Sequence, residues 1–409
     1  MRKLAHIEKI VNIEPIYLLE NNQPADSIEL ATVLGWKVVV KKGEYQVGDL
    51  AVFVEIDSIL PALPEFDFLA NRNYKIKTMK LNKFYYGNPD NRVVSQGILF
   101  KTDILNIKLT EGADVTDLLK ITKIEDETPE TAEQSKESRL KAAAQRHKFL
   151  RTKLGKFLMK KAWFRNLILK TIAKKKTSKN FPSYITKTDE TRIQALPIAF
   201  EEWKKRELEN KVTWIVTEKL DGTSTTFAIQ KNNKKFDFAV CSRNVRQESP
   251  NQKTWYDQNG GAETNYYWEQ AFKINAEKSL MYLFDFLKAK DHVILQGETI
   301  GPSIQGNRYK LKERQFFAFN LIVDGKKFNS MEARAILGEL SINFVPILEV
   351  TQSIPNTIDE VIQSASGKTV IGSSGAYREG LVIRDINSTI SFKAISVEYL
   401  LKNDLWYIN

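Results

Sequence analysis

The chain has 409 residues, of which 42% are hydrophobic and 11% aromatic, and its formal net charge is +11. This length predicts two or three domains, each with its own core, and the composition excludes an intrinsically disordered protein. The single cysteine, Cys241, excludes an internal disulfide and a cysteine-based metal cluster. The three histidines argue against a histidine-rich zinc site and a histidine-driven hydrolase.

The sequence contains no apolar run long enough to span a bilayer, and charges interrupt the apolar residues of its first stretch, MRKLAHIEKIVNIEP. Such a stretch is a poor secretory signal. We therefore expect no membrane span and an intracellular protein, cytoplasmic in the simplest case, with an organellar location left open.

Residues 1–120 are predicted to be all-β, because apolar and polar residues alternate in short runs bounded by Gly and Pro. Strands are expected at 36–41 (WKVVVK), 50–56 (LAVFVEI), 74–79 (YKIKTM) and 97–100 (GILF). Short strands and turns over this length indicate a small barrel or sandwich.

Residues 121–180 are predicted to be an acidic linker, IEDETPETAEQ, followed by a basic helical segment at 136–179. This segment has sixteen Lys or Arg and one acidic residue, so the positive charge of the protein is concentrated here. Its apolar residues recur mostly at spacings of three, four and seven, which predicts one or two amphipathic helices. Two interpretations have equal weight: a helix packed on the domains with a solvated basic face, or a clamp on nucleic acid or an anionic surface.

Residues 181–409 are predicted to form an α+β domain, with helices at 281–290 and 330–340. The stretch TEKLDGTSTTFAI, at 217–229, has strand-like flanks around Asp221 and Gly222. These two residues predict a hairpin turn, since Gly adopts a positive φ without steric cost. By itself this stretch is read most simply as a hairpin with an exposed lysine, Lys219.

Segments further along the chain change that interpretation, because together with Lys219 they contain the parts that nucleotidyl transfer needs. Lys219 is a candidate nucleophile for an α-phosphate if burial, a nearby cation or a metal lowers the pKa of its amine. Glu298 and Glu379 are oxygen ligands suited to Mg²⁺ or Mn²⁺. Arg243 and Lys393 supply positive charge for phosphate oxygens in the transition state.

Two smaller roles complete this set. Asp221 is a candidate to hold a ribose hydroxyl or to order metal-bound water. Phe317 and Phe319 alternate along a strand and so share a face that can offer an aromatic surface to adenine. The sequence leaves open which of the two stacks on the base.

The segments KLDG, SRN, GE, FFAFN, EGLVIR and FK, in that order, resemble the motif series of the covalent nucleotidyltransferases. This superfamily includes the ATP-dependent DNA and RNA ligases and the mRNA capping enzymes. Each motif is weak alone, but the ordered set is specific. Ser224 stands where DNA ligases usually have Arg, and the segment FPSYITKTDETRIQ at 181–194 is similar to a signature of the Deinococcus and Naegleria type of RNA ligase.

This resemblance implies an N-terminal OB-type β-barrel at 1–120 and a ligase-type nucleotidyltransferase domain at 181–409, hence an α+β multidomain protein. It also implies a covalent lysyl–AMP intermediate, with Lys219, Arg243 and Lys393 as catalytic residues and Asp221, Glu298 and Glu379 as metal ligands. The implied nucleotide site comprises Glu218, Lys219, Leu220, Asp221, Gly222, Ser224, Arg243, Glu298, Phe317, Phe319, Glu379 and Lys393.

One motif departs from the family pattern. The last motif often has two lysines as KxK, but Ile395 stands two residues after Lys393. If Ser391 aligns with the first lysine, that lysine is the missing one. Arg384 or Lys402 is then a candidate to supply the absent phosphate contact.

The expected function is that of an ATP-dependent RNA ligase using Mg²⁺ or Mn²⁺, acting as a monomer on nicks with an RNA 3′-hydroxyl strand. One alternative is another covalent nucleotidyltransferase, either a DNA ligase or a GTP-dependent capping enzyme. The other is a non-catalytic OB-fold nucleic-acid-binding protein. Nucleotide choice distinguishes a capping enzyme, which would take GTP, and absence of label from ATP would support the non-catalytic protein.

Overall fold

In the computed structural model, the described residues are 3–105, 109–123, 181–233, 235–249 and 265–404, with isolated positions between 149 and 168. The predicted acidic linker beyond residue 123 and the predicted helices of the basic segment 136–179 therefore lie outside the described residues, apart from those isolated positions. None of the described helices combines the length and the apolar composition that crossing a membrane requires.

The N-terminal part is a strongly curved antiparallel sheet built around one long strand. That strand, β1 (Ala5–Leu18), pairs with β4 along residues 5–9, with β2 along residues 10–17 and with β7 at its end, so three neighbours share it. The strand order of the sheet is β3 (Trp36–Lys41), β2 (Pro24–Val33), β1, β4 (Leu50–Val54) and β9 (Ile98–Lys101). In addition, β7 (Met79–Tyr86) pairs with β1, and β8 (Asn88–Ser95) pairs with β7. A small sheet of β5 (Ser58–Ile59), β6 (Lys75–Ile76) and β10 (Thr122–Lys123), and the 3-10 helices η1 (Pro64–Arg72) and η2 (Thr102–Leu105), complete it.

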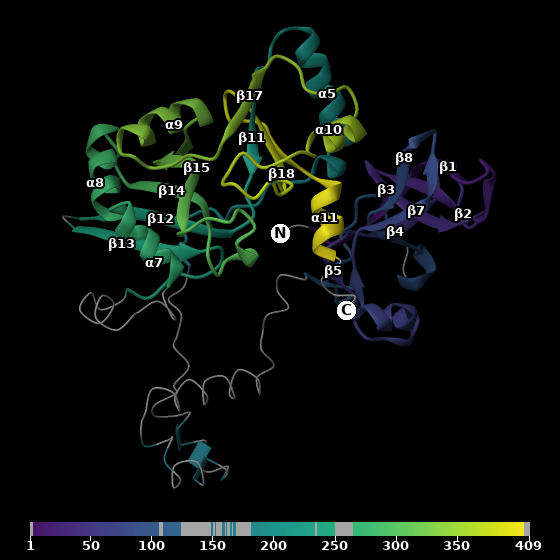
Figure 1. Ribbon diagram of the computed structural model, residues 1–409, viewed down its shortest axis with the longest axis horizontal. Helices are drawn as coiled ribbons and strands as arrows, with labels where there is room; N and C mark the ends of the chain where they lie inside the picture. Colours follow the sequence, from purple (N-terminus) through teal and green to yellow (C-terminus); the bar gives the residue numbers. More distant parts are fainter. Residues whose placement is uncertain are drawn as a thin grey trace.

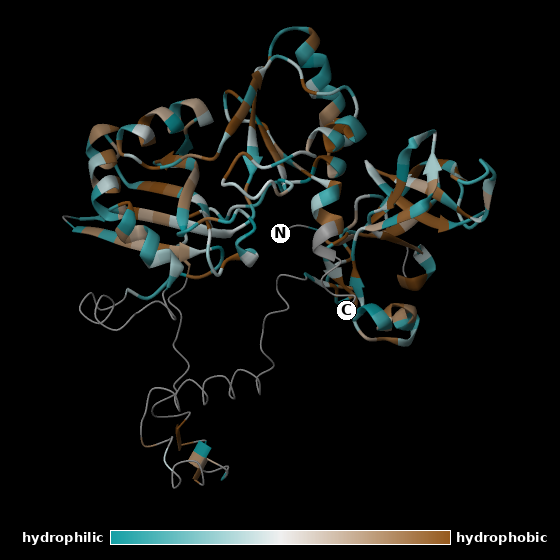
Figure 2. Cartoon of the chain, viewed as in Figure 1, coloured by the Kyte–Doolittle hydropathy of each residue, from teal (hydrophilic) through white to brown (hydrophobic). Residues whose placement is uncertain are grey.

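The apolar residues of this part form two buried clusters, a larger one that includes Trp36, Phe53 and Val115 and a smaller one that includes Ile16, Leu30 and Val93. Figure 2 shows the apolar colouring concentrated on the strands of this part and of the C-terminal part. The predicted strands at 36–41, 50–56 and 97–100 correspond to β3, β4 and β9. The predicted strand at 74–79 is wrong, because Tyr74 has a left-handed φ of 58° and only Lys75–Ile76 pair before β7 starts.

The C-terminal part contains two antiparallel sheets with helices on their outer sides (Figure 1). One sheet has the order β17 (Ile347–Thr351), β11 (Trp214–Lys219), β18 (Gly380–Asp385) and β19 (Ser391–Ile395). The other has the order β13 (Lys235–Ser242), β12 (Thr223–Asn232), β14 (His292–Ile300), β15 (Gln315–Val323) and β16 (Lys326–Lys327). The 3-10 turns η4 (Ile193–Ala195) and η5 (Gln305–Asn307) lie in the connections.

Each sheet shares a core with its own helices. α7 (Tyr266–Lys273), α8 (Ala276–Phe286) and α9 (Ser330–Glu339) pack on the sheet that contains β14, and α5 (Pro197–Leu208) and α10 (Ile358–Ser364) pack on the sheet that contains β11. The predicted helix at 330–340 is α9. The predicted helix at 281–290 is displaced: it starts earlier, at Ala276, and ends at Phe286, since Lys288 takes a left-handed φ of 55°.

The predicted hairpin at Asp221 and Gly222 is wrong, because the strands on either side of this turn belong to different sheets. β11 pairs with β17 and β18, whereas β12 pairs with β13 and β14. Gly222 does not have a positive φ. It is required for another reason: a Cβ at this position would lie 2.3 Å from the carbonyl oxygen of Thr299, where the chain crosses β14 closely.

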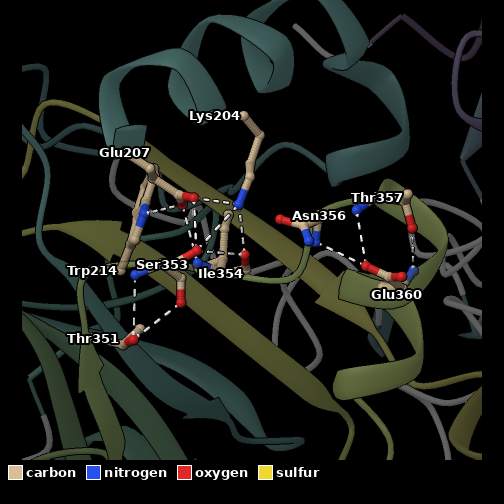
Figure 3. Close-up of polar contacts among 9 residues, drawn as sticks. All are labelled: Lys204, Glu207, Trp214, Thr351, Ser353, Ile354, Asn356, Thr357 and Glu360. Carbon is tan, nitrogen blue, oxygen red and sulfur yellow. Dashed lines mark hydrogen bonds and ion pairs between the residues drawn. The ribbon is translucent and has the colours of Figure 1, made fainter. Parts of the chain in front are cut away.

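A buried carboxylate holds the first residue of β11 in place (Figure 3). Glu207 of α5 accepts hydrogen bonds from Trp214 Nε1 at 2.6 Å, from Ser353 Oγ at 2.9 Å and from the backbone N–H of Ile354 at 3.1 Å. The loop that contains Ser353 leads to α10, whose N-terminus Thr357 caps. Helix α5, β11 and this loop therefore form one rigid support behind the strand that ends at Lys219.

Candidate active site

A cavity of about 710 Å³ lies between the two C-terminal sheets. Residues of β11, β18 and β19 line one side and residues of β12, β14 and β15 line the other. Of the predicted site residues, those that line it are Glu218, Lys219, Leu220, Asp221, Gly222, Ser224, Arg243, Glu298, Phe319, Glu379 and Lys393. The fold thus brings together motifs that are separated by up to 175 positions in the sequence.

Lys219 is the last residue of β11, and its Nζ lies 2.6 Å from Glu379 Oε1. Burial by itself lowers the pKa of Lys219, but the carboxylates of Glu379 and Glu298 outweigh burial and raise this pKa above its usual range. The sequence-based expectation of a lowered pKa therefore does not describe this state. The raised pKa favours the protonated amine, which becomes a nucleophile only once its proton leaves. Positive charge close to the carboxylates would favour that loss.

The carboxylates of Glu298 and Glu379 both lie close enough to Lys219 to act on its charge. Burial, together with the neighbouring charges of Glu379 and Asp221, raises the pKa of Glu298 to about 8. Burial also raises the pKa of Glu379. Two buried carboxylates with raised pKa values are a donor set that a divalent cation would stabilise, so these residues fit Mg²⁺ or Mn²⁺.

The third predicted metal ligand, Asp221, has a different partner. Its Oδ2 lies 2.8 Å from Arg308 Nη1, and its backbone N–H donates to the Tyr309 hydroxyl at 2.6 Å. Among the residues that the structure describes, no three histidine, cysteine or acidic side chains converge into a preformed metal site. Asp221, Glu298 and Glu379 are therefore not brought together as one ligand set.

Arg243 and Lys393, the predicted phosphate-binding cations, share Asp189 across the cavity. Asp189 Oδ1 is 3.0 Å from Lys393 Nζ, and its Oδ2 is 3.5 Å from Arg243 Nη2. Burial and the nearby charge of Lys219 lower the pKa of Lys393 to about 8, although Asp189 opposes this shift. Asp189 thus holds the side chains of Arg243 and Lys393 in the cavity that also contains Lys219. A bound phosphate could replace the Asp189 carboxylate as the partner of these two cations.

The residues at which the last motif departs from the family pattern, Ser391 and Ile395, lie on the same face of β19 as Lys393. Ser391, Lys393 and Ile395 alternate along this strand, and Lys393 and Ile395 line the cavity. Arg384 pairs with Ser391 across the strands and donates from Nε to its hydroxyl at 3.2 Å. Arg384 also donates to Glu190 at 2.8 Å, so its guanidinium is already hydrogen-bonded at the place of the missing cation. The side chain of Lys402 lies outside the described residues.

The two candidate aromatic residues have different environments. Phe317 is 8% exposed and packs in a cluster with Leu220, Tyr309 and Val345. Phe319 is half-buried and lines the cavity. The structure therefore offers Phe319, and not Phe317, as the aromatic surface of the site.

Sequence reasoning missed several residues that line the cavity. Asp189, Glu190 and Arg192 lie in the segment at 181–194, whose resemblance to a family signature assigns no role to these residues. Arg308, Lys327 and Tyr399 carry no local signal. Five of these residues line the cavity, and Arg308 lies behind it, paired with Asp221.

The N-terminal part closes one end of the cavity. Asp57 and Lys123 line it, and Arg192 donates to Asp57 at 2.6 Å. Leu400, in α11 (Val397–Asp404), packs against the N-terminal core, and Figure 1 shows this helix between the two parts. The cavity is thus bounded by both parts of the chain.

Comparisons with known proteins agree with this architecture. A family described as an OB-fold domain matches residues 4–102, and the family described as RNA ligase matches residues 212–398. A search of curated proteins finds no match.

Among solved structures, the chain is similar to the RNA ligase of Naegleria gruberi. The structure of that enzyme with pyrophosphate is 27% identical, covers 99% of both chains and has a TM-score of 0.70. Structures of two mutants are each 26% identical and cover 98% of this chain and 99% of the other: one with AMP and Mn has a TM-score of 0.68, and one with ATP and Mn has a TM-score of 0.67.

Proposed function

Because the chain is an RNA ligase with an N-terminal OB-fold domain, we propose that it consumes ATP to join RNA ends and that Lys219 carries the nucleotide. The observation that supports this most strongly is the position of the Lys219 amine, at the end of β11 and 2.6 Å from Glu379, inside a cavity lined by cations. The domain division at 1–120, 121–180 and 181–409 is part of this proposal.

In the first step, the Lys219 amine attacks the α-phosphate of ATP. A phosphorus–nitrogen bond forms, the bond to the bridging oxygen breaks, and pyrophosphate leaves. The amine must first lose a proton, and Glu379 Oε1, in contact with it, is positioned to accept this proton. A divalent cation held by Glu298 and Glu379 would neutralise these carboxylates and the phosphates, and would lower the pKa of Lys219.

The next two steps transfer and release AMP. An oxygen of an RNA 5′-phosphate displaces Lys219 from the AMP phosphorus, and the lysine regains its amine. A 3′-hydroxyl then attacks the activated 5′-phosphate, forms a phosphodiester and releases AMP. Arg243 and Lys393 supply positive charge for phosphate oxygens in these in-line transfers, and both can exchange Asp189 for phosphate.

The nucleotide and the RNA bind in different ways in this proposal. Phe319 stacks on adenine, because it is the aromatic residue that faces the cavity. RNA is held mainly through its phosphates, by the N-terminal domain and by the basic segment 136–179, so that binding weakens as salt rises. The substrate we propose is a nick in a duplex with an RNA 3′-hydroxyl strand.

Labelling of the protein with α-labelled ATP and Mg²⁺ or Mn²⁺ tests the function. We expect covalent label that survives denaturation of the protein on the wild type and none on Lys219→Ala. Lys211→Ala is the matched control, since this lysine is 67% exposed and ion-paired with Glu209 on the surface. Labelling by GTP in place of ATP would indicate a capping enzyme, and no labelling of folded wild-type protein free of prior AMP would leave nucleic-acid binding as the function.

Sealing assays identify the substrate. We expect a nick with an RNA 3′-hydroxyl strand to be joined faster than an all-DNA nick or a free single strand. Deletion of residues 136–179 should lower RNA affinity and its salt dependence while lysine labelling continues. Unchanged RNA binding after this deletion would contradict the clamp and favour a surface or partner role.

A further inference from the structure

Two consecutive residues that belong to none of the recognised motifs hold Asp221. Arg308 Nη1 lies 2.8 Å from Asp221 Oδ2, and the two side chains are only 15% and 13% exposed. Tyr309 is 1% exposed, and its hydroxyl accepts a hydrogen bond from the backbone N–H of Asp221 at 2.6 Å. The residue two positions after Lys219 is therefore fixed through both its side chain and its backbone.

The segment that carries Arg308 is itself well supported. The Asn307 side chain donates to the carbonyl of Leu311 at 2.9 Å and accepts from its N–H at 3.1 Å, which closes the turn. The second terminal nitrogen of Arg308 donates to the carbonyl of Tyr377 at 3.2 Å. Because both terminal nitrogens of Arg308 have hydrogen-bond partners, its long side chain has lost most of its rotamer freedom before any ligand binds.

The C-terminal helix supports Arg308 from the other side. The Arg308 guanidinium lies 4.5 Å from the ring centre of Tyr399 on α11, and the Tyr399 hydroxyl also hydrogen-bonds to Asp221. The next residue of the helix, Leu400, packs against the N-terminal core. Helix α11 thus contacts both the loop after Lys219 and the N-terminal domain.

We propose that Arg308 is a positioning residue for nucleotide transfer, which orients Asp221 and the loop after Lys219, and that Tyr399 braces it. The proposal rests on the function proposed above. Its physical basis is that the guanidinium neutralises the Asp221 carboxylate and, together with the Tyr399 hydroxyl, fixes the direction in which that carboxylate faces a ribose hydroxyl or metal-bound water.

A double-mutant cycle on lysine labelling tests this coupling. The rate of label transfer from ATP is measured at several ATP concentrations for Arg308→Met, Arg308→Lys, Asp221→Asn and the double variant Arg308→Met/Asp221→Asn. Lys312→Met is the matched control, since it removes an exposed positive charge from the same segment. Rates are expressed per folded molecule, with the folded fraction taken from a thermal unfolding curve of each full-length variant.

We expect Arg308→Met to lower the second-order rate constant by about 10- to 100-fold, the usual effect of a misplaced reacting group. Arg308→Lys should recover part of this loss. The double variant should be no slower than Asp221→Asn alone, because Arg308 acts through Asp221. Losses that multiply in the double variant, or an equal loss in Lys312→Met, would overturn the proposal.

Tyr399 provides a second test that does not depend on the folding of the Arg308 variants. Tyr399→Phe keeps the ring over the guanidinium, whereas Tyr399→Leu removes it and should lose about fivefold more rate, the usual weight of such a contact. Equal rates for Phe and Leu would refute the bracing role. Absence of label on wild-type protein would refute the proposed function itself, whereas normal labelling of every Arg308 and Tyr399 variant would refute only the inference about positioning.

Discussion

His6 makes the stability of the N-terminal domain dependent on pH. It is 4% exposed in β1, where its Nδ1 lies 2.7 Å from Glu8 Oε1 and its Nε2 lies 3.5 Å from Glu55 Oε1. Burial by itself lowers the pKa of His6, but hydrogen bonds to Glu55 and Glu8 and their charges outweigh it and raise the pKa from 6.5 to about 9. The folded domain therefore holds a proton that the unfolded chain releases at lower pH.

The sign and the size of the effect follow from these two values. Below pH 6.5 both states bind the proton, and the stabilisation is fully present. As the pH rises from 6.5 to 9 the unfolded state loses its proton first, so the free energy of unfolding falls. The difference between the two pKa values corresponds to about 3 kcal/mol, since 1.36 kcal/mol accompanies each pKa unit.

Hydrogen-exchange mass spectrometry of peptides from β1 and β4 measures this change in the intact chain. After correction for the intrinsic exchange rate, the opening free energy of the wild type should fall between pH 6.5 and 9, and that of His6→Gln should not. Glu20→Gln, which removes an exposed carboxylate from the same domain, should keep the wild-type slope. A wild-type slope equal to that of His6→Gln, or one that rises with pH relative to it, would refute the reasoning.

Three further predictions concern the support of the site. Gly222→Ala should slow lysine labelling by about 100-fold and cost about 1–3 kcal/mol of stability, as labelling kinetics and urea unfolding will show, because its Cβ cannot fit against β14; normal labelling would contradict this. Glu207→Leu should destabilise the C-terminal domain by about 3 kcal/mol in the same unfolding assay, since Trp214 loses its buried acceptor, and no change would show that the network is dispensable. Phe319→Ala should raise the KM for ATP in labelling with little loss of stability, whereas Phe317→Ala should lower the free energy of unfolding by about 3–5 kcal/mol. The reverse pattern would mean that Phe317 stacks on adenine and Phe319 supports the core.

Much of the site could be predicted from the sequence because its chemistry resides in short motifs. The order of KLDG, SRN, GE, FFAFN, EGLVIR and FK identified Lys219, Glu298 and Glu379 before any geometry was known, and the structure places all three on one cavity. Helix 330–340 and strand 36–41 were also predictable. Their apolar spacing is a local property that the final packing did not override.

Other features were not predictable, since they depend on which strands become neighbours. The turn at Asp221 and Gly222 has the local chemistry of a hairpin, yet β11 and β12 enter different sheets. β11 pairs with strands more than a hundred positions away, and β12 pairs with β13 and β14. Alternation alone could not choose between Phe317 and Phe319, because it places both on one face. Only the packing around Leu220 buries the first and leaves the second at the cavity.

The sequence by itself determined which residues are the candidates for the chemistry and the order in which they occur. The tertiary structure decided what surrounds them. Arg308 is 87 residues from Asp221, and Asp189 is 204 from Lys393, and no local pattern reveals such pairs. The pKa of Lys219 is raised because folding brings the carboxylates of Glu379 and Glu298 from two distant segments beside it, and their combined charge acts on Lys219 only after the two sheets have packed.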